Sequence, residues 1–391
     1  MSAIRKDILD LVPNGIGKVA MEALGEPDVI ALWFGESDLV TPPFIREAAK
    51  RALDEGKTFY NYARGLHELR RAICGYHRRI VGADIDVDRI SMPGAAVLSV
   101  VTALQCLVET GDNVVIVSPI WPSIFQAAEV VGAELRFCRL DEDWADGRWR
   151  LDLDKLFSLC DGRTNAIFVN SPGNPTGWIA SRSEQQAILD FSRRRGIAFI
   201  SDEVYGTMVY DGRLHAPSLL QIADKDDEIF VINSFSKPWA MTGWRIGWMV
   251  HPPSLSEPMK VICVANNTGP AVFAQYGALA ALTPEGDAFR AVMLERCRTG
   301  REVVQEFLAT QNRIRWIKPD GAFYGFLHIE GLTDSLGFAL GLVREGRVGV
   351  APGSAFGPEA ANDSYVRICF AQDPARLRLG LERLTAATAR R

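Results

Sequence analysis

The residues best suited to chemistry follow an apolar, β-branched run at Ile229–Ile232, which indicates a buried strand. Ser234, Ser236 and Lys237 come shortly after it, and Arg245 stands eight residues beyond the lysine. Burial of an unpaired ammonium is costly, but it yields the neutral amine that Schiff-base chemistry requires. Two hydroxyls and a guanidinium also suit a phosphate group. By itself this stretch favours pyridoxal phosphate (PLP) about as strongly as an ordinary buried salt bridge.

Similar apolar runs recur along the chain, at 113–119, 134–140, 166–172, 197–203, 230–236 and 246–251. Runs of this kind are typical of strands buried on both faces, and helical segments at 123–131 and 183–195 lie between them. The alternation predicts an α/β fold with a mostly parallel central sheet. Ligands of such sheets bind outside the carboxyl ends of the strands. The polar segments expected at these ends are Trp121, 170–177, 202–205 and 234–237.

A second candidate phosphate contact is the small-residue turn Pro93–Ala96. It follows a predicted strand at 89–92 and begins an apolar helix that continues to Leu107. Small residues at such a junction expose backbone N–H groups at the positive end of the helix, where a phosphate binds well. A tight packing corner would explain the same residues equally well.

The two ends of the chain indicate a second, smaller unit. At the start we expect a short helix within residues 4–12 that serves as an arm packing on another subunit, then a strand at Ile30–Phe34 and a helix from Thr41. A long helix at 287–310 is followed by strands within 314–330, VGVAPG and YVRICFA, with helices at 334–346 and 374–389. We therefore predict an arm with part of the small domain at 1–42, a large domain at 43–285 and a small α+β domain at 286–391.

Composition excludes several classes of protein. A net charge of −5 gives no electrostatic footprint for nucleic acid, and no apolar run approaches the ~18 residues of a membrane span. Seven scattered cysteines without a CxxC pair indicate free thiols and a cytoplasmic location. The five histidines form no ligand-spaced metal cluster. GIGKVA at 15–20 follows no strand, so it does not indicate dinucleotide binding and a dehydrogenase is disfavoured.

Several motifs in register resemble the fold-type I, class I/II aminotransferases, in the branch that contains the aspartate and aromatic aminotransferases. The core of the resemblance is SPGNPTG (171–177), DEVY (202–205) and SFSK (234–237) with Arg245. Further matches are KTFYNYARGLHELRRAI, PGAAV, PIWPSIF, PDGAFY and YVRICFA. The resemblance implies the type I fold of PLP-dependent transferases: a large domain with a mostly parallel sheet flanked by helices, plus a smaller α+β domain.

The resemblance also implies the catalytic roles. Lys237 is expected to bind PLP as a Schiff base and then to move a proton between the substrate Cα and the cofactor. Asp202 would keep the pyridine nitrogen protonated, which makes the ring an electron sink. Tyr205 and Asn174 would hydrogen-bond the phenolic oxygen of the cofactor, and Trp121 would stack on its ring.

The remaining implied contacts are to the phosphate and the substrate. The phosphate would be held by Ser234, Ser236, Arg245 and the backbone at Gly94, Ala95 and Ala96. Tyr60 would reach it from the partner subunit of a homodimer. Arg367 would clamp the substrate α-carboxylate bidentately, and Gly35, Trp121 and Asn174 would complete that site.

The implied reaction moves an amino group from an L-amino acid to a 2-oxo acid, with 2-oxoglutarate as the expected acceptor, by a ping-pong mechanism. A second cation for a distal carboxylate is missing from VICVANN (261–267); Lys18 and Lys260 are substitutes that the sequence alone does not place. The expected lining is apolar and aromatic, which favours apolar or aromatic donors and leaves aspartate open: Trp33, Phe34, Ile120, Phe323 and Tyr324.

Other functions remain to be weighed. A PLP-dependent C–S β-lyase shares the same fold and the same early chemistry. An effector-binding domain of a transcription regulator would need a winged-helix domain first, and the motifs already begin by residue 30. When each residue is considered alone, a structural role explains it as well as the role implied by the resemblance. Asp202 would be a helix N-cap, Trp121 a core aromatic and Arg367 the partner of a surface acid.

Overall fold

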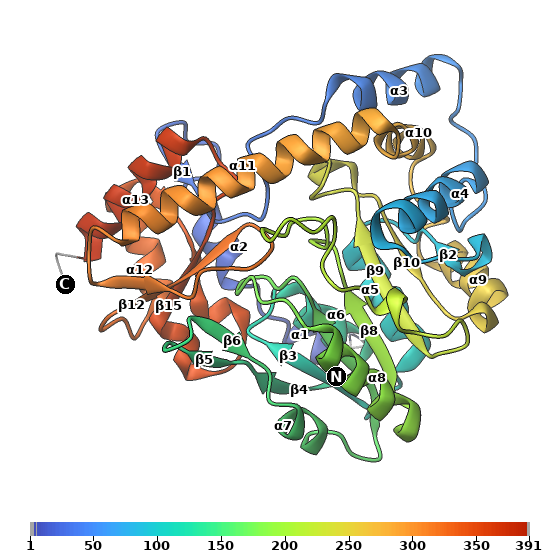
Figure 1. Ribbon diagram of the computed structural model, residues 1–391, viewed down its shortest axis with the longest axis horizontal. Helices are drawn as coiled ribbons and strands as arrows, with labels where there is room; N and C mark the ends of the chain where they lie inside the picture. Colours follow the sequence, from blue (N-terminus) through green and yellow to red (C-terminus); the bar gives the residue numbers. More distant parts are fainter. Residues whose placement is uncertain (1–3, 5, 389–391) are drawn as a thin grey trace.

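The computed structural model describes residues 4 and 6–388, and its centre is a seven-stranded sheet (Figure 1). The strand order is β2 (Ile90–Ser91), β10 (Gly247–Val250), β9 (Ile229–Ser234), β8 (Ala198–Asp202), β7 (Thr164–Asn170), β3 (Asn113–Ser118) and β4 (Glu134–Arg139). Strands β9, β8, β7, β3 and β4 run parallel, whereas β10 is antiparallel to β9 and β2 is antiparallel to β10. The predicted α/β class, the mostly parallel sheet and its six apolar strands are confirmed.

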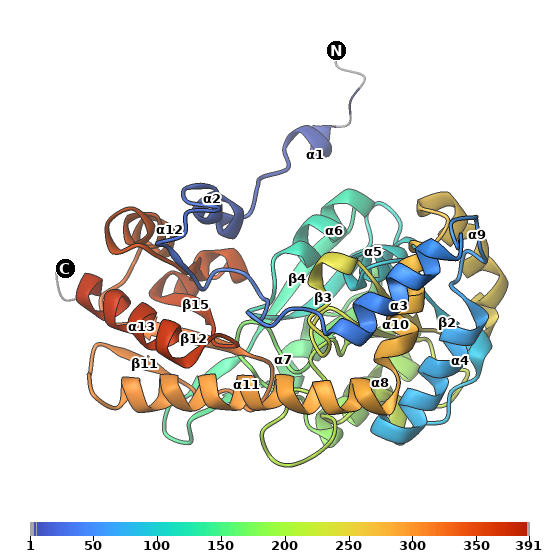
Figure 2. The same ribbon diagram turned by 90° about the horizontal axis from the view of Figure 1, so that it is seen from above.

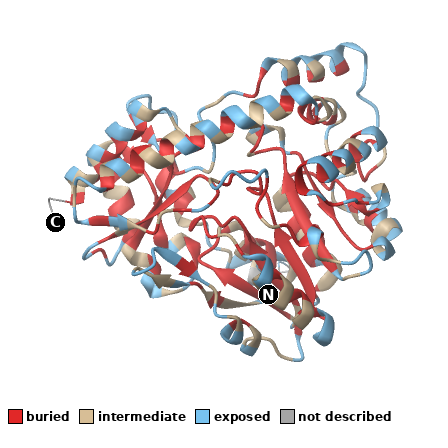
Figure 3. Ribbon diagram, in the orientation of Figure 1, coloured by how far each residue is buried: buried red, intermediate tan, exposed pale blue. Residues whose placement is uncertain are grey.

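The sheet separates two apolar cores, which is why its strands are apolar at nearly every position (Figure 3). Successive side chains of a strand point to opposite faces. Thus Val114 and Ile116 pack with α5 (Ala96–Leu107) and α6 (Ser123–Val131), while Val115 and Val117 belong to the core on the α8 (Arg182–Arg195) side. The helices α4 (His67–Tyr76), α3 (Pro43–Asp54), α9 (Ser256–Asn266) and α10 (Val272–Ala281) complete this part of the chain.

A second sheet is formed by the last third of the chain. Its antiparallel order is β11 (Ile314–Trp316), β12 (Tyr324–Ile329), β15 (Tyr365–Cys369) and β14 (Ala351–Pro352). Two helices, α11 (Pro284–Leu308) and α13 (Pro374–Thr388), pack against each other, and Figure 1 shows α11 running along the molecule from α13 to α10. The other predicted strands and helices of this region are confirmed, but VGVAPG forms two short strands in different sheets, β13 (Val348–Gly349) and β14. The helix expected at 334–346 consists of α12 (Ser335–Gly341) followed by a π turn at Leu342–Gly346.

The N-terminal region differs most from expectation. The strand predicted at Ile30–Phe34 is only β1 (Ile30–Ala31), paired in parallel with β13 (Val348–Gly349), because Trp33, Phe34 and the following glycine turn towards a cavity. Besides α1 (Lys6–Leu9), the chain forms a helix that the sequence did not predict, α2 (Gly15–Met21), which lies beside α12 (Figure 2). The hairpin β5 (Asp141–Asp143) and β6 (Arg148–Arg150) and the helix α7 (Leu153–Ser158) were also not predicted.

The domain borders expected after residues 42 and 285 stay predictions, and residues 1–3, 5 and 389–391 of the outer two segments lie outside the described residues. No helix within residues 4 and 6–388 is both long and apolar enough to cross a membrane.

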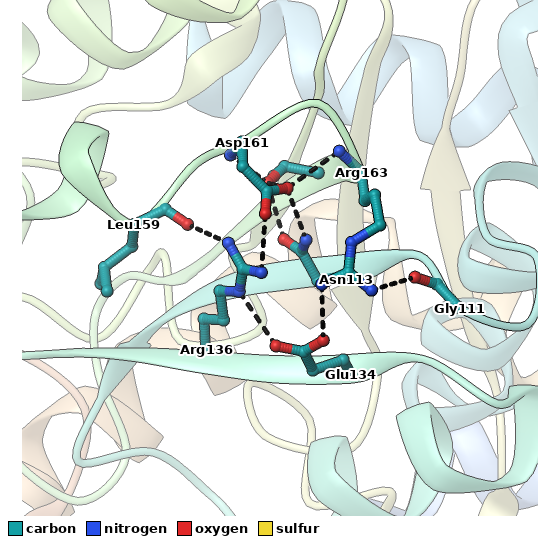
Figure 4. A network of polar contacts seen from close by, with 8 residues as sticks. Gly111, Asn113, Glu134, Arg136, Leu159, Asp161 and Arg163 are labelled. Atoms are coloured by element: carbon teal, nitrogen blue, oxygen red, sulfur yellow. Dashed lines mark hydrogen bonds and ion pairs between the residues drawn. The ribbon is translucent and has the colours of Figure 1, made fainter.

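At the amino ends of the central strands, a polar network joins three segments (Figure 4). The carboxylate of Asp161 accepts hydrogen bonds from Asn113 Nδ2 at 2.9 Å, from Arg136 Nη2 at 2.8 Å and from the backbone N–H of Arg163 at 2.8 Å. Arg136 also donates to the carbonyl of Leu159 at 2.8 Å. Because the network lies at the amino edge, it leaves the opposite edge of the sheet free for a ligand.

Candidate active site

The carboxyl ends of β7, β8 and β9 bring the predicted polar residues together. Asn170 and Asp202 are cross-strand partners, and the Nδ2 of Asn170 donates to the carbonyl of Asp202 at 3.0 Å. Beyond these strand ends lies a cavity of about 350 Å³. It is lined by Asn14, Ile16, Gly17, Trp33, Phe34, Gly35, Ala96, Val97, Trp121, Pro122, Ser123, Asn174, Asp202, Val204, Tyr205, Ser234, Ser236, Lys237, Arg245, Tyr324 and Arg367.

Lys237 follows β9 and projects into this cavity. Its Nζ donates a hydrogen bond to the carbonyl of Gly35 at 2.6 Å and lies 5.9 Å from the centre of the Tyr205 ring. Burial lowers the pKa of Lys237 to about 8, and the positive charges of Arg367 and Arg245 act in the same direction. A substantial fraction of the amine is therefore neutral near physiological pH, as a nucleophile or base requires.

Asp202 is a buried carboxyl without a cationic partner. Burial raises its pKa to about 7, against the opposing effects of the Val204 N–H, the nearby Trp121 indole and the charge of Lys237. Within the described part of the chain no cation lies within ion-pair distance of it. A buried acid in this state favours binding of a ligand that brings a positive charge. The alternative role as a helix N-cap is wrong, since the residues directly after β8 form turns and not a helix.

One end of the cavity is suited to a phosphate. The N-cap residue of α5 is Ala95, which has no side-chain hydrogen bond to the helix, so the N–H groups of Ala96 and Val97 face the cavity uncapped. Ser234, Ser236 and Arg245 line the same cavity. A Cβ at Gly247 would collide with the carbonyl of Asn233 and approach the N of Ala96 to 3.1 Å, so a glycine is needed where β10 passes the start of α5.

A second group of contacts in the cavity is organised by Arg367, in β15. Its guanidinium donates to Asn174 Oδ1 at 3.2 Å and to the carbonyl of Trp33, and it stacks over the Tyr324 ring at 4.6 Å. Its Nε has no hydrogen-bond partner among the described residues, although the side chain is buried. A buried guanidinium with an unused donor and no acid beside it fits an incoming carboxylate. The alternative, a surface acid as its partner, does not hold.

The structure gives a second reason for the glycine at position 35, and the expected role of Gly35 at the substrate carboxylate stays a prediction. The sequence predicted that its lack of a side chain would admit the substrate; in the structure, a Cβ at this position would collide with the hydroxyl of Tyr324. That hydroxyl lies 2.7 Å from the hydroxyl of Tyr205. The contact with Tyr324 therefore requires a glycine at position 35, and the carbonyl of this glycine accepts the hydrogen bond from Lys237.

Most of the predicted site residues line this one cavity: Gly35, Ala96, Trp121, Asn174, Asp202, Tyr205, Ser234, Ser236, Lys237, Arg245 and Arg367. Gly94 and Ala95 are not among the lining residues; they lead into α5 just behind it. Tyr60 is 93% exposed and lies with Phe59 in a separate surface hollow beside residues 267–273. The role proposed for Tyr60 involves a second subunit and stays a prediction.

Of the five residues expected to line the substrate pocket, two do not line the cavity. Ile120 is buried in the core, where its N–H donates to the carbonyl of Phe356 at 2.8 Å, and Phe323 packs edge-on against Tyr205 at 5.4 Å. Neither substitute cation lines the cavity of its own subunit, and a contribution from the partner subunit stays a prediction. Lys18 is exposed on α2, and Lys260 lies 4.0 Å from Glu257 on the surface of α9.

Asn14, Ile16, Gly17 and Val97 line the cavity without having been predicted to do so. A local signal did exist for three of them: Asn14 is an N-cap whose Oδ1 accepts the N–H of Gly17 at 2.9 Å, and Ile16, Val19 and Ala20 have helical spacing. What brings this helix to the cavity is its packing on α12 and β14, more than 300 residues away along the chain.

The donors and acceptors of the cavity fit PLP. Uncapped N–H groups, two hydroxyls and Arg245 suit its phosphate, Asp202 suits its ring nitrogen, and Lys237 lines the same cavity. The described residues contain no cluster of His, Cys, Asp or Glu that would hold a metal ion.

Comparisons with known proteins agree with this geometry. Residues 27–384 match the sequence model described as aminotransferase class I and II. The chain is 34% identical over 363 residues to an aspartate aminotransferase of Pyrococcus horikoshii, covering 92% of this chain and 90% of that protein. It is 33% identical over 384 residues to aromatic-amino-acid aminotransferase 2 of Thermococcus litoralis, covering 97% and 96%.

Two solved structures show the same fold over essentially their whole length. A single mutant of Thermus thermophilus aspartate aminotransferase is 28% identical, has a TM-score of 0.89 and covers 99% of this chain and 100% of its own. An aminotransferase from Mycobacterium tuberculosis is 27% identical, has a TM-score of 0.91 and covers 100% of both chains.

Proposed function

Since the chain belongs to the class I and II aminotransferase family and is a PLP-dependent aminotransferase, we propose that it moves an amino group from an L-amino acid to a 2-oxo acid in two half-reactions. The donor leaves as its oxo acid before the acceptor enters the same site, and 2-oxoglutarate is the proposed acceptor. The observation that carries this proposal is the cavity in which Lys237, Asp202 and Arg367 meet.

Lys237 is the proposed base. When bound, PLP supplies a carbonyl carbon that takes up the amino group and a ring that withdraws electrons from the substrate Cα. The Nζ of Lys237, with its pKa lowered to about 8, would take the proton from the substrate Cα and deliver it to the carbonyl carbon of the cofactor. Its hydrogen bond to the carbonyl of Gly35 would hold the amine inside the cavity whenever Lys237 is not bound to PLP.

Asp202 and Arg367 are proposed to orient the two ends of the reaction. The carboxylate of Asp202 holds a proton on the ring nitrogen, because a positive charge beside a buried acid stabilises both groups. Arg367 receives the substrate α-carboxylate through a planar pair of N–H donors, which directs Cα towards Lys237. Asn174 is held beside Arg367, because its Oδ1 accepts a hydrogen bond from the guanidinium.

The side-chain pocket favours apolar or aromatic donors. Its cations are Lys237, Arg245 and Arg367, and each has a role with PLP or the α-carboxylate, so none within the described lining remains for a distal carboxylate. The wall formed by Ile16, Trp33 and Phe34 offers apolar surface instead. Of the relatives, one is named as an aromatic-amino-acid and another as an aspartate aminotransferase, so the names alone do not decide.

We also propose that two copies form the functional unit and that Tyr60 of each copy reaches the phosphate end of the other. Support comes from the solvent-exposed apolar side chains that share a surface hollow with Tyr60, namely Phe59 and Phe273. The cytoplasmic location expected from the free cysteines stays a prediction.

The proposed function is tested by visible absorption of the PLP-loaded protein during titration with single amino acids. The colour should fade with a true donor and return on addition of 2-oxoglutarate, and the donor that acts fastest identifies the substrate class. Release of ammonia and pyruvate without an acceptor would identify a β-lyase instead. Lys237→Ala should abolish the cycle, whereas Lys225→Ala, which removes an exposed lysine, should leave it unchanged.

A further inference from the structure

We propose that Tyr324 is a positioning residue whose hydroxyl donates a hydrogen bond to Tyr205 and so keeps the Tyr205 proton available for the phenolic oxygen of PLP. This inference rests on the proposed function, because it needs the cofactor in the cavity. It concerns a residue outside the loops that carry the strand-end motifs: Tyr324 is the first residue of β12, in the second sheet.

The two phenols meet from different sheets. Tyr205 lies in the loop after β8, and the two hydroxyl oxygens are 2.7 Å apart, a normal O–H···O distance. The exposed fraction is 4% for Tyr205 and 0% for Tyr324, and both residues line the cavity. Because burial removes water as an alternative partner, each hydroxyl depends on the few groups that surround it.

The supply of acceptors decides which oxygen donates. A phenol has one proton to donate and can accept from others. Among the described residues Tyr205 is the one hydrogen-bond partner of the Tyr324 hydroxyl, so an unused Tyr324 O–H would be buried without an acceptor. If Tyr324 donates, both oxygens are satisfied and the O–H of Tyr205 is free to point into the cavity. In the opposite arrangement Tyr205 would donate its proton to Tyr324, and none would remain for PLP.

Three contacts hold Tyr324 in this position. The glycine at 35 leaves room for its hydroxyl, since any Cβ there would collide with it. The guanidinium of Arg367 stacks on its ring at 4.6 Å, and the Phe323 ring lies 4.8 Å away. Tyr324 therefore joins the carboxylate anchor to the phenol that faces the cofactor.

The titration behaviour is consistent with this direction. Burial raises the pKa of Tyr205, and the hydrogen bond from Tyr324 opposes that rise. Burial also raises the pKa of Tyr324, and its hydrogen bond with Tyr205 adds to the rise, as expected for the donor of the pair.

The test is a spectroscopic pH titration of the PLP-loaded protein. A donor to the phenolic oxygen lowers the proton affinity of the nitrogen through which Lys237 binds PLP. Tyr205→Phe removes that donor, so it should raise the pKa of the colour change by the full amount. This shift is the reference for the Tyr324 variant. Tyr324→Phe should shift this pKa in the same direction but less, by roughly half a unit to one unit.

Tyr210→Phe is the matched control. Tyr210 donates to the carbonyl of Ala322, two residues before Tyr324, but it does not line the cavity. Loss of its hydroxyl should leave the colour change at the wild-type pKa. Thermal unfolding of all variants shows whether each is folded.

A kinetic comparison separates the hydroxyl from the ring. Tyr324→Phe keeps the surface under Arg367, so kcat should fall roughly three- to tenfold while the KM of the amino donor stays near that of the wild type. Tyr324→Leu loses the stacking surface as well and should also raise the KM. If the Tyr324→Phe protein titrates like the wild type, the proposed role is wrong even though PLP binds. If the wild type binds no PLP, it is the proposed function that fails.

Discussion

Lys237 and Asp202 illustrate how one environment shifts two pKa values in opposite directions. Burial disfavours whichever form is charged, so it lowers the pKa of the lysine to about 8 and raises that of the aspartate to about 7. Both groups are thereby brought into the pH range in which the reaction must run, and neither has a countercharge in ion-pair contact within the described residues.

Asp202→Asn should stabilise the PLP-free protein above neutral pH. The folded-state pKa of about 7 lies above the ordinary value of 3.8, so the unfolded chain releases this proton first as the pH rises. The free energy of unfolding therefore falls between these two values and stays lower above them. The asparagine variant lacks this titration and should gain relative to the wild type through that window, as urea unfolding at several pH values would show.

The same substitution should weaken PLP binding, since a neutral amide does not hold a protonated ring nitrogen. A variant that is no more stable than the wild type at alkaline pH would contradict the interpretation of Asp202 as an uncompensated buried acid.

Arg367→Lys should lower kcat/KM for amino donors roughly 10- to 100-fold, because one of two charge-assisted hydrogen bonds to the α-carboxylate is lost. The absorption spectrum of bound PLP should stay unchanged. Arg301→Lys is the control: Arg301 stacks on Tyr210 at 4.7 Å, outside the cavity. Equal losses in the two variants would show a general effect of arginine removal on folding.

The sequence predicted which residue types gather at the site more fully than it predicted their contacts. Strand-end position and motif register were enough to place Lys237 and Asp202 at one cavity. The Tyr205–Tyr324 pair was not predictable, because it joins two sheets whose relative placement depends on packing between distant segments. For the same reason the sequence did not show that Tyr324 also requires a glycine at position 35.

At the scale of elements, the polar network around Asp161 connects the amino ends of β3 and β4 to the loop before β7. Its hydrogen bonds hold the pKa of Asp161 well below the ordinary 3.8. A depressed pKa of this kind contributes stability above the unfolded value, and that contribution is lost as the pH falls through the folded one.

Asp161→Asn should therefore lower the urea midpoint at neutral pH, and the difference from the wild type should shrink as the pH falls below 3.8. Turnover should be unaffected because the network lies at the other edge of the sheet. Glu382→Gln, an exposed carboxyl on α13, is the control and should leave the midpoint unchanged. A loss that persists in acid would mean that packing, not charge, is responsible.

Long elements were predictable and short ones were not. Buried strands such as β3 and β9 are apolar at most positions, and α11 has clear start signals at Thr283 and Pro284. By contrast, α2 is a short helix with two glycines, and β1 has only two paired residues. Elements this short take their structure from the neighbours on which they pack, so local patterns carry little information about them.

At the scale of the whole molecule, the proposed dimer makes a prediction about mixed subunits. A hybrid of a Lys237→Ala subunit and a Tyr60→Phe subunit should contain one fully normal site, because the second subunit supplies the lysine and the first supplies the tyrosine. PLP titration of the purified hybrid should show half the wild-type number of sites, with wild-type affinity. The Tyr60→Phe homodimer serves as the control and should bind PLP more weakly at every site.

If Tyr60 acted within its own subunit, the hybrid would bind PLP with the affinity of the Tyr60→Phe protein. Sedimentation that showed only single chains at working concentration would also contradict the dimer.

The contacts around residues 32–36 join the two ends of the chain at the site. Arg367 donates to the carbonyl of Trp33, the N–H of Cys369 donates to the carbonyl of Leu32, and Lys237 donates to that of Gly35. During synthesis, the early segment must therefore wait until its partners in β15 have left the ribosome. A nascent chain that ends before β15 contains every strand of the central sheet but lacks Arg367, the proposed anchor for the substrate carboxylate. Competence to bind substrate thus arises only at the end of translation, and any product truncated before β15 would be inactive however well its larger part had folded.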